Sequence, residues 1–87
     1  MERNIAVVTG ASSGIGEASA RRLVAEGFHV VVVARRADRL EALVKEVGNA
    51  TAVECDVTDD DSVRRLAEVV TRLGGRLRLL VNNAGGA

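Results

Sequence analysis

Apolar residues gather in four short runs along the chain, and three longer amphipathic segments separate these runs. The runs cover residues 5–8, 28–34, 50–55 and 77–81, and four consecutive valines stand inside the second run. Short runs rich in β-branched residues are typical of strands that are buried on both faces of a parallel sheet. The pattern therefore predicts four strands.

The segments between the runs carry apolar residues at spacings of three and four, which predicts amphipathic helices. We expect helices over residues 15–26, from 38 to about 48, and from about 58 to 73. Thr58 and the three aspartates after it supply a cap and negative charge at the start of the third helix, and the glycine pair 74–75 closes its end. The expected apolar face of the third helix consists of Val63, Leu66, Ala67, Val70 and Leu73.

Strands that alternate with helices predict an α/β fold of Rossmann type, in which helices cover both faces of a doubly wound parallel sheet. We expect a partial sheet of four strands and three helices with the strand order 3-2-1-4. The first two helices should cover one face and the third helix the other. No proline and no low-complexity linker interrupts the chain. Residues 1–87 are therefore expected to be the N-terminal part of one dinucleotide-binding domain, truncated after the fourth strand.

The turn between the first strand and the first helix reads Thr-Gly-Ala-Ser-Ser-Gly-Ile-Gly over residues 9–16. Gly10 lets the chain turn sharply, Gly14 leaves room for a pyrophosphate, and Gly16 allows close contact between helix and sheet. The free amides of the helix start and the two serine hydroxyls can donate to phosphate oxygens. The glycine spacing differs from the common G-x-G-x-x-G pattern, so a tight turn that binds no ligand remains an alternative.

Two arginines, Arg35 and Arg36, follow the second expected strand, where a dinucleotide fold holds the adenosine ribose. An acidic residue there binds the ribose 2′-hydroxyl of NAD, whereas a guanidinium can grip the 2′-phosphate of NADP with two parallel hydrogen bonds. Ala34 brings no carboxylate that would repel this phosphate, and Arg39, one helical turn further on, is placed to assist. The pattern favours NADP(H), with NAD(H) as the other option. Alternatively, the arginines are solvated or pair with Asp38.

Asp56 and Val57 close the third expected strand, beside the expected adenine position. The carboxylate can accept a hydrogen bond from the adenine amino group, while the Val57 amide reaches a ring nitrogen. In the alternative interpretation, Asp56 caps the turn that follows. Cys55 is interpreted as a small buried strand residue, because no partner base is visible. Nothing in the sequence places an acid or a hydroxyl beside His29.

Charge and composition exclude several other functions. Twelve basic and twelve acidic residues cancel, so no net field recruits nucleic acid or an anionic membrane. Phe28 is the only aromatic residue and provides no stacking platform for single-stranded nucleic acid. The lone cysteine has no neighbours at metal-ligand spacing, so we expect no metal and a reducing, cytoplasmic setting. We find neither a signal peptide nor an apolar run of about 20 residues that would span a membrane.

Three stretches together resemble the N-terminal half of the short-chain dehydrogenase/reductase family. They are the glycine turn at 9–16, the pair Asp56-Val57, and the sequence Leu-Val-Asn-Asn-Ala-Gly at 80–85, in the order and approximate spacing that the family uses. The resemblance covers essentially the whole chain. It implies that Arg35 contacts the 2′-phosphate and that Asn82 helps to tie the central strands together. The implied cofactor-binding residues are Gly10, Ser12, Ser13, Gly14, Ile15, Gly16, Arg35, Arg36, Asp56, Val57, Asn83, Ala84 and Gly85.

The resemblance also implies an oxidoreductase that transfers hydride between a nicotinamide cofactor and a carbonyl or alcohol substrate. Family members use a serine and a Tyr-x-x-x-Lys motif that lie beyond the Asn-Asn-Ala-Gly stretch. This chain contains no tyrosine, and its only lysine is Lys45 in the second expected helix. We therefore expect an NADP(H)-binding fragment that has no catalytic residue and is inactive alone. Its intact form is expected to act on a small molecule as a homo-oligomer.

Two other functions fit parts of the pattern. One is a non-catalytic module that binds or senses NADP(H). The other is a methyltransferase-like fold for S-adenosylmethionine, against which the arginine after the second strand argues. For the 87-residue chain alone we also predict poor solubility or partial unfolding, because one edge of the fourth strand and part of one sheet face would be open.

Overall fold

The computed structural model describes residues 3–11, 14–35, 38–56 and 58–82 of the chain. Strands and helices alternate along all of these ranges, as the sequence pattern predicts. The elements are β1 (Arg3–Thr9), α1 (Gly14–Ala25), β2 (His29–Ala34), α2 (Asp38–Val47), β3 (Ala50–Glu54), α3 (Asp60–Arg72) and β4 (Gly75–Asn82).

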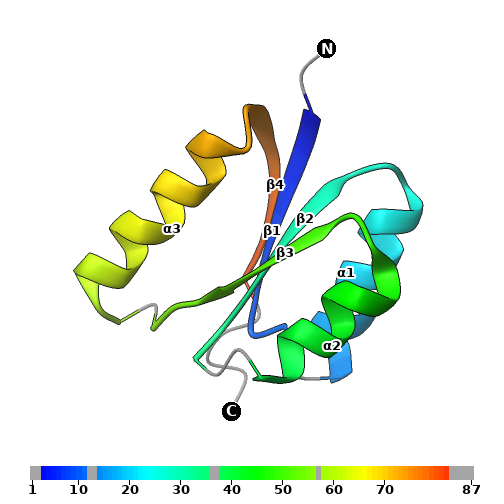
Figure 1. Cartoon of the computed structure of the whole chain (residues 1–87), viewed down its shortest axis with the longest axis horizontal. Helices are drawn as coiled ribbons and strands as arrows, with labels where there is room; N and C mark the ends of the chain where they lie inside the picture. The colour runs from blue at the N-terminus through cyan, green and yellow to red at the C-terminus, as the bar shows by residue number, and fades with distance from the viewer. Residues whose placement is uncertain (1–2, 12–13, 36–37, 57, 83–87) are drawn as a thin grey trace.

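The four strands form one parallel sheet with the order β3-β2-β1-β4, which confirms the predicted topology (Figure 1). Since the strands are parallel, their carboxyl ends lie at one edge of the sheet. The pairing of Thr9 with both Val33 and Asn82 brings the ends of β1, β2 and β4 together at this edge. Glu54 of β3 pairs with Ala34 there. The turns that follow the strands are therefore neighbours in space.

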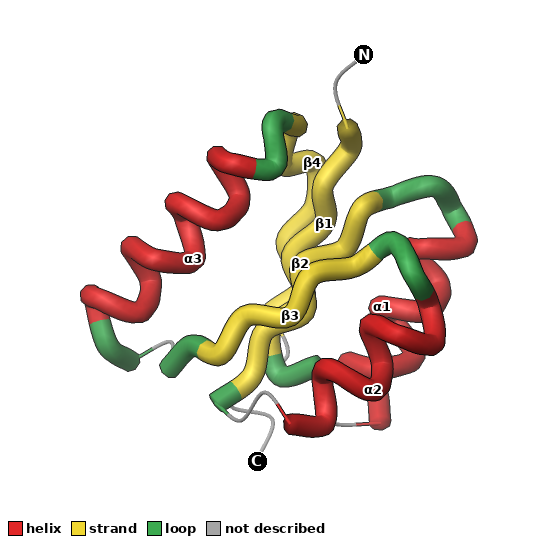
Figure 2. Tube along the Cα trace, viewed as in Figure 1, coloured by secondary structure: helices red, strands yellow, loops and turns green. Residues whose placement is uncertain are grey.

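Helices α1 and α2 cover one face of the sheet and α3 covers the other, as expected (Figure 2). Alternate strand residues supply the two cores, because successive side chains of a strand point to opposite faces. Ala6 and Val8 of β1 face α1 and α2, whereas Ile5 and Val7 face α3. All six residues of β2 are buried. A strand covered on both faces in this way explains the run of consecutive valines.

The boundary between α3 and β4 differs from the sequence prediction. Gly74 has a φ of 69° and ends the turn after the helix, but Gly75 begins β4 and pairs with Arg3. A side chain on Gly75 would meet the Arg3 carbonyl oxygen at 2.5 Å, so close strand packing requires a glycine at this position. At its other end, α3 has Asp59 as its N-cap residue and not Thr58.

The buried face of α3 is rotated relative to the predicted stripe. Leu66, Val70 and Leu73 pack against the sheet as expected, and Val69 joins them. Val63 is 42% exposed and Ala67 is also exposed, so both predictions are wrong. Ser62 is buried in the first turn instead. Its hydroxyl donates to Asp59 Oδ2 at 3.0 Å and accepts from Arg65 at 3.2 Å, which offsets the cost of burying a polar group.

His29 has polar partners that the sequence did not reveal. Its Nδ1 lies 2.8 Å from Asn49 Oδ1, and its Nε2 lies 2.8 Å from the hydroxyl oxygen of Thr51. The expectation that no hydroxyl stands beside His29 is therefore wrong. The strand pairing explains the contacts, because Val30 pairs with Ala50 and so brings residues about 20 apart in sequence together. Both ring nitrogens of this buried side chain are hydrogen-bonded.

Strand β4 remains the least covered strand. Leu77, Leu79 and Leu80 are 52%, 39% and 58% exposed. Within the described ranges, β4 pairs only with β1. The open strand edge and apolar exposure that we predicted are thus present. None of the helices in the described part of the chain combines the length and apolarity that a membrane crossing requires.

Candidate functional site

The glycine turn after β1 stands at the centre of the carboxyl edge of the sheet. Gly10 has a φ of 64°, a left-handed conformation that favours glycine, and thereby turns the chain out of the strand. The Ala11 amide then donates to the Val33 carbonyl oxygen at 3.1 Å, which ties the turn to β2. A Cβ on Gly16 would lie 2.4 Å from the Gly10 carbonyl oxygen and 2.8 Å from the Ala11 Cα. The start of α1 therefore packs directly on the backbone of the turn, and the expected role of Gly16 holds.

Gly14, the first residue of α1, has a different environment. No described atom lies within 4 Å of the position that a Cβ on Gly14 would take. The next residue, Ile15, is 74% exposed. A helix start that is open on one side can receive an anion, because its first amides have no partner within the helix. The tight contact at Gly16 agrees with its predicted packing role, whereas the phosphate contact at Gly14 stays a prediction.

Several predicted site residues lie outside the described ranges. Of the predicted cofactor-binding set, the structure describes Gly10, Gly14, Ile15, Gly16, Arg35 and Asp56. The residues outside the described ranges are Ser12, Ser13, Arg36, Val57, Asn83, Ala84 and Gly85. Those described follow β1, β2 and β3, so the topology brings them to the same edge of the sheet.

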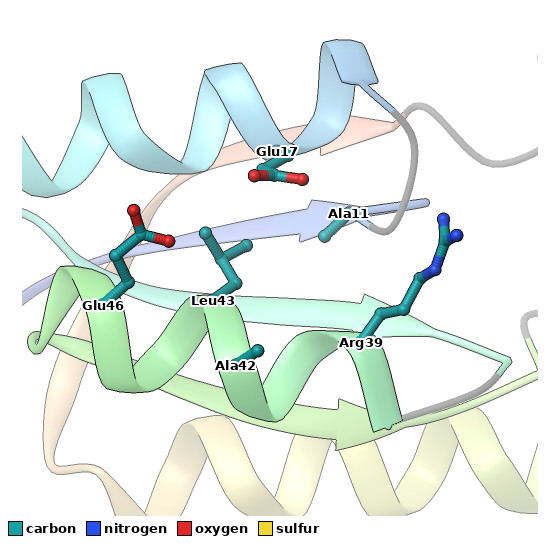
Figure 3. A pocket seen from close by; sticks show the side chains of 6 residues that line it. All are labelled: Ala11, Glu17, Arg39, Ala42, Leu43 and Glu46. Carbon is teal, nitrogen blue, oxygen red and sulfur yellow. The ribbon is translucent and has the colours of Figure 1, made fainter.

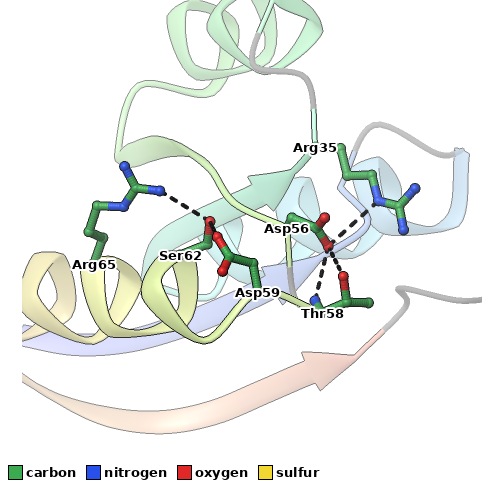
Figure 4. A network of polar contacts seen from close by, with 6 residues as sticks. All are labelled: Arg35, Asp56, Thr58, Asp59, Ser62 and Arg65. Atoms are coloured by element: carbon green, nitrogen blue, oxygen red, sulfur yellow. Dashed lines mark hydrogen bonds and ion pairs between the residues drawn. The ribbon is translucent and has the colours of Figure 1, made fainter.

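Asp56 and Arg35 meet across the ends of β2 and β3 (Figure 4). Oδ1 of Asp56 accepts hydrogen bonds from the Thr58 amide at 3.0 Å and the Thr58 hydroxyl at 2.7 Å. The same oxygen lies 3.9 Å from Nε of Arg35. The bonds from Thr58, followed by the charge of Arg35, hold the pKa of the Asp56 carboxyl below its usual value. Asp56 therefore caps the turn as the alternative interpretation expected, and its carboxylate is charged at neutral pH.

The Arg35 guanidinium is held only loosely by this pair. Its side chain is 75% exposed, and a 3.9 Å separation is longer than a good charge-assisted hydrogen bond. Arg35 is therefore available to an anion at the end of β2. The neighbouring residue Ala34 is buried and carries no charge.

Cys55, next to this site, has the environment of a packing residue. Its side chain is 3% exposed, and its amide donates to the Ala34 carbonyl oxygen at 2.9 Å. Burial raises the pKa of the Cys55 thiol, and the Asp56 carboxylate raises it further. The thiol therefore stays protonated at neutral pH, which supports its interpretation as a small buried residue.

The ends of β1 and β4 are joined by side chains. The Thr9 hydroxyl donates to the Asn82 side-chain oxygen at 3.0 Å and approaches the Val81 carbonyl oxygen at 3.4 Å. Asn82 thus ties β4 to β1, the tie between strands that the family resemblance implied.

A hollow of about 270 Å³ lies between α1 and α2, next to the glycine turn (Figure 3). Arg21 bridges two of the lining carboxylates, with its Nη2 atom 3.0 Å from Glu17 Oε1 and 2.7 Å from Glu46 Oε2. These contacts lower the pKa of Glu46 and raise that of Arg21. Sequence reasoning missed this cluster, although the spacing of Glu17 and Arg21 is the usual one for a helical ion pair. The hollow is lined by Ala11, Glu17, Arg39, Ala42, Leu43 and Glu46.

Comparison with known proteins shows which family the chain belongs to. The sequence profile described as short chain dehydrogenase matches residues 4–87. The chain belongs to the short-chain dehydrogenase family. An uncharacterised oxidoreductase of Mycobacterium tuberculosis (strain CDC 1551 / Oshkosh) is 66% identical over 61 residues, which cover 70% of this chain and 24% of that protein.

Two solved structures show the same fold. A metagenomic short-chain oxidoreductase in complex with NADP has a TM-score of 0.87 and 40% identity, and the match covers 98% of this chain and 40% of that one. A 3-ketoacyl-(acyl-carrier-protein) reductase from Brucella melitensis, complexed with NADH, has a TM-score of 0.84 and 34% identity over 91% of this chain and 33% of that one. The chain spans about a quarter to a third of the length of the curated relatives that it matches.

Proposed function

We propose that residues 1–87 form the N-terminal, cofactor-binding part of an NADP(H)-dependent short-chain dehydrogenase/reductase. The glycine turn at the carboxyl edge of the sheet carries this proposal. In open α/β sheets, ligands bind where the strand order reverses. In the order β3-β2-β1-β4, this point lies at the end of β1, where Gly10 and Gly14 stand.

The described residues fit a dinucleotide. The open side of Gly14 has room for a pyrophosphate against the amides at the start of α1. Gly10 and Gly16 keep the turn close to the helix, so the backbone itself forms the phosphate cradle. The exposed Ile15 offers apolar surface that a bound cofactor would cover. Ser12, Ser13, Asn83, Ala84 and Gly85 complete the proposed set by their positions in the sequence.

The adenosine end would lie along the carboxyl ends of β2 and β3. Asp56 and Val57 would hold the adenine, and Arg35 with Arg36 would bind a 2′-phosphate. The uncharged Ala34 and the exposed guanidinium of Arg35 favour NADP(H) over NAD(H). The relatives leave both cofactors open, because one solved structure contains NADP and another contains NADH.

A bound nicotinamide would supply the hydride that is exchanged with a carbonyl or alcohol carbon of a small-molecule substrate. The 87 residues contribute binding and orientation to this chemistry. They contain no tyrosine, and Lys45 lies in the last turn of α2, at the end of the helix away from the glycine turn (Figure 1). We therefore propose that these residues alone catalyse no turnover.

Equilibrium binding of NADP⁺ to the encoded polypeptide, measured by calorimetry, tests the proposal. We expect saturable binding that Gly14→Val weakens at least about tenfold, because a side chain there displaces the pyrophosphate from amides that form charge-assisted hydrogen bonds. Thermal unfolding of the same variant should change little, since no described atom opposes a Cβ at Gly14. A folded protein that binds neither NADP⁺ nor NAD⁺ would contradict the proposal.

Gly16→Ala is the matched variant in the same turn. Its Cβ would collide with the backbone of Gly10 and Ala11, so the turn has to move. We expect a loss of about 1–3 kcal/mol in the free energy of unfolding, the usual cost of overpacking. The two variants thus separate ligand contact from packing. Equal destabilisation by both would show that Gly14 is needed only for the fold.

A further inference from the structure

Glu17 places a negative charge close to the turn that the proposed cofactor phosphates would occupy. It lies in the first turn of α1, three residues after Gly14, and its side chain lines the same hollow as Ala11 of the glycine turn (Figure 3). At a rise of about 1.5 Å per residue, Glu17 is about 4.5 Å from Gly14 along the helix axis. Charges act over about 8–10 Å in physiological salt. An uncompensated carboxylate on Glu17 would therefore oppose a bound pyrophosphate.

Arg21 compensates this carboxylate. Its Nη2 atom lies 3.0 Å from Glu17 Oε1 and 2.7 Å from Glu46 Oε2, so one guanidinium joins α1 to α2. Arg21 stands one turn beyond Glu17 on α1, and the ion pair therefore draws the carboxylate along the helix, away from its start. Arg39, the remaining charged residue of the lining, forms no ion pair with either glutamate in the described part of the chain.

The exposure of these side chains decides what the contact can do. The side chains of Arg21, Glu17 and Glu46 are 40%, 44% and 62% exposed, and ion pairs at such positions contribute little to the stability of a fold. Their charges can still act on an anion at the helix start, because Coulomb interactions extend over several ångströms without direct contact. A change at Arg21 should therefore affect anion affinity more than folding.

We propose that Arg21 is a positioning residue that holds the Glu17 carboxylate away from the glycine turn and so keeps the turn able to bind the pyrophosphate of a dinucleotide. This inference rests on the proposed function, because it assumes a dinucleotide at the glycine turn. It extends that function to a side chain that has no proposed contact with the cofactor. NADP(H) and NAD(H) share the pyrophosphate, so Arg21 should affect both affinities equally, in contrast to Arg35.

The test measures the affinities of NADP⁺ and NAD⁺ for the encoded polypeptide and its variants by calorimetry. Relative to the wild type in the same salt, we expect Arg21→Gln to weaken both about fivefold at low ionic strength and less than about twofold in about 0.5 M salt, which screens the repulsion. Arg21→Lys keeps the charge and should bind within about twofold of the wild type. Arg22→Gln is the matched control, because it removes the same charge and a pair of the same spacing, with Glu26 at 3.0 Å, from the other end of α1.

A double variant separates the charge of Arg21 from its structural contacts. Glu17→Gln combined with Arg21→Gln removes the carboxylate that Arg21 is proposed to hold, so both affinities should return to within about twofold of the wild type. A merely structural role predicts continued weakening, because the double variant also lacks the bridge from α1 to Glu46. Weak binding by the folded double variant, or a loss in Arg21→Gln that is the same at both salt concentrations, would overturn the inference.

The remaining outcomes separate this inference from the proposed function. If Arg21→Gln leaves both affinities unchanged, weakens NADP⁺ alone, or acts no more strongly than Arg22→Gln, the role of Arg21 is wrong and the proposed function stands. If the folded wild-type protein binds neither dinucleotide, both fail. Circular dichroism shows whether each variant is folded. Should Arg21→Gln not fold, Glu17→Gln carries the comparison: it should bind both dinucleotides more tightly than the wild type at low ionic strength, and unchanged or weaker binding would overturn the inference.

Discussion

The Asp56 carboxylate is bound to the turn that follows β3, and this contact determines how it titrates. Two hydrogen bonds from Thr58 reach the same oxygen that faces Arg35 at 3.9 Å. Hydrogen bonds and cations that stabilise the charged form lower the pKa of a carboxyl group. Since the folded pKa lies below the unfolded value, the resulting stabilisation is present above about pH 4 and is lost as the pH falls through the folded pKa.

We therefore predict that the Asp56 carboxyl titrates below the usual value of about 3.9, as measured by NMR of its carboxyl carbon against pH. Thr58→Val removes the strongest of the contacts and should raise the pKa toward that value. Arg35→Gln should raise it less, because the guanidinium is distant and exposed. A larger increase with Arg35→Gln than with Thr58→Val would show that the ion pair, and not the turn, holds the charge.

Single residues also show where sequence reasoning is sufficient. Steric rules predicted the roles of Gly10 and Gly16, because a sharp turn and a close helix contact leave few alternatives to glycine. The same reasoning could not choose between an adenine contact and a cap for Asp56. It also missed the pairing of Arg35 with Asp56, since that contact depends on which strands become neighbours.

At the scale of elements, the sequence predicted all seven helices and strands but placed the buried face of α3 incorrectly. The predicted stripe excluded Ser62, because a serine is usually read as exposed. In the structure, Asp59 and Arg65 bond its hydroxyl, so Ser62 can turn inward. The helix then presents Val69 to the sheet and leaves Val63 42% exposed. These bonds within α3 and its N-cap thus make a buried serine compatible with the observed orientation of the helix.

This orientation predicts different costs for two identical substitutions in α3. Val69→Ala should lower the free energy of unfolding by about 1 kcal/mol, because it removes packed methyl groups. Val63→Ala should change it by less than about 0.5 kcal/mol, as is usual at exposed positions. Urea unfolding followed by circular dichroism measures both. Both variants remove the same atoms from the same helix, so a larger loss at Val63 would support the stripe that the sequence predicted.

At the scale of the whole molecule, the strand order followed from connection rules. Right-handed crossovers and one reversal after β3 give β3-β2-β1-β4 and put α3 alone on its face. The uneven cover has a consequence for β4. Its pairing with Ile5 and Val7 places Leu77 and Leu80 on the α3 face, where both remain more than half exposed. The sequence did not predict a partner for the outer edge of β4. Strand pairing joins residues that are far apart in sequence, and no local pattern identifies them.

We predict that a purified polypeptide of residues 1–87 self-associates or precipitates as its concentration rises. Two exposed leucines beside a strand edge offer both apolar surface and unpaired backbone groups to another chain. Leu77→Lys combined with Leu80→Lys should increase the monomer fraction in sedimentation velocity, because charged side chains oppose edge-to-edge pairing. Ile15→Lys is the control, since it replaces an apolar residue away from β4 that is even more exposed, at 74%. A wild-type chain that stays monomeric and unfolds cooperatively at every concentration would contradict this prediction. An equal increase in the monomer fraction with Ile15→Lys would show that general apolar exposure, and not the edge of β4, causes the association.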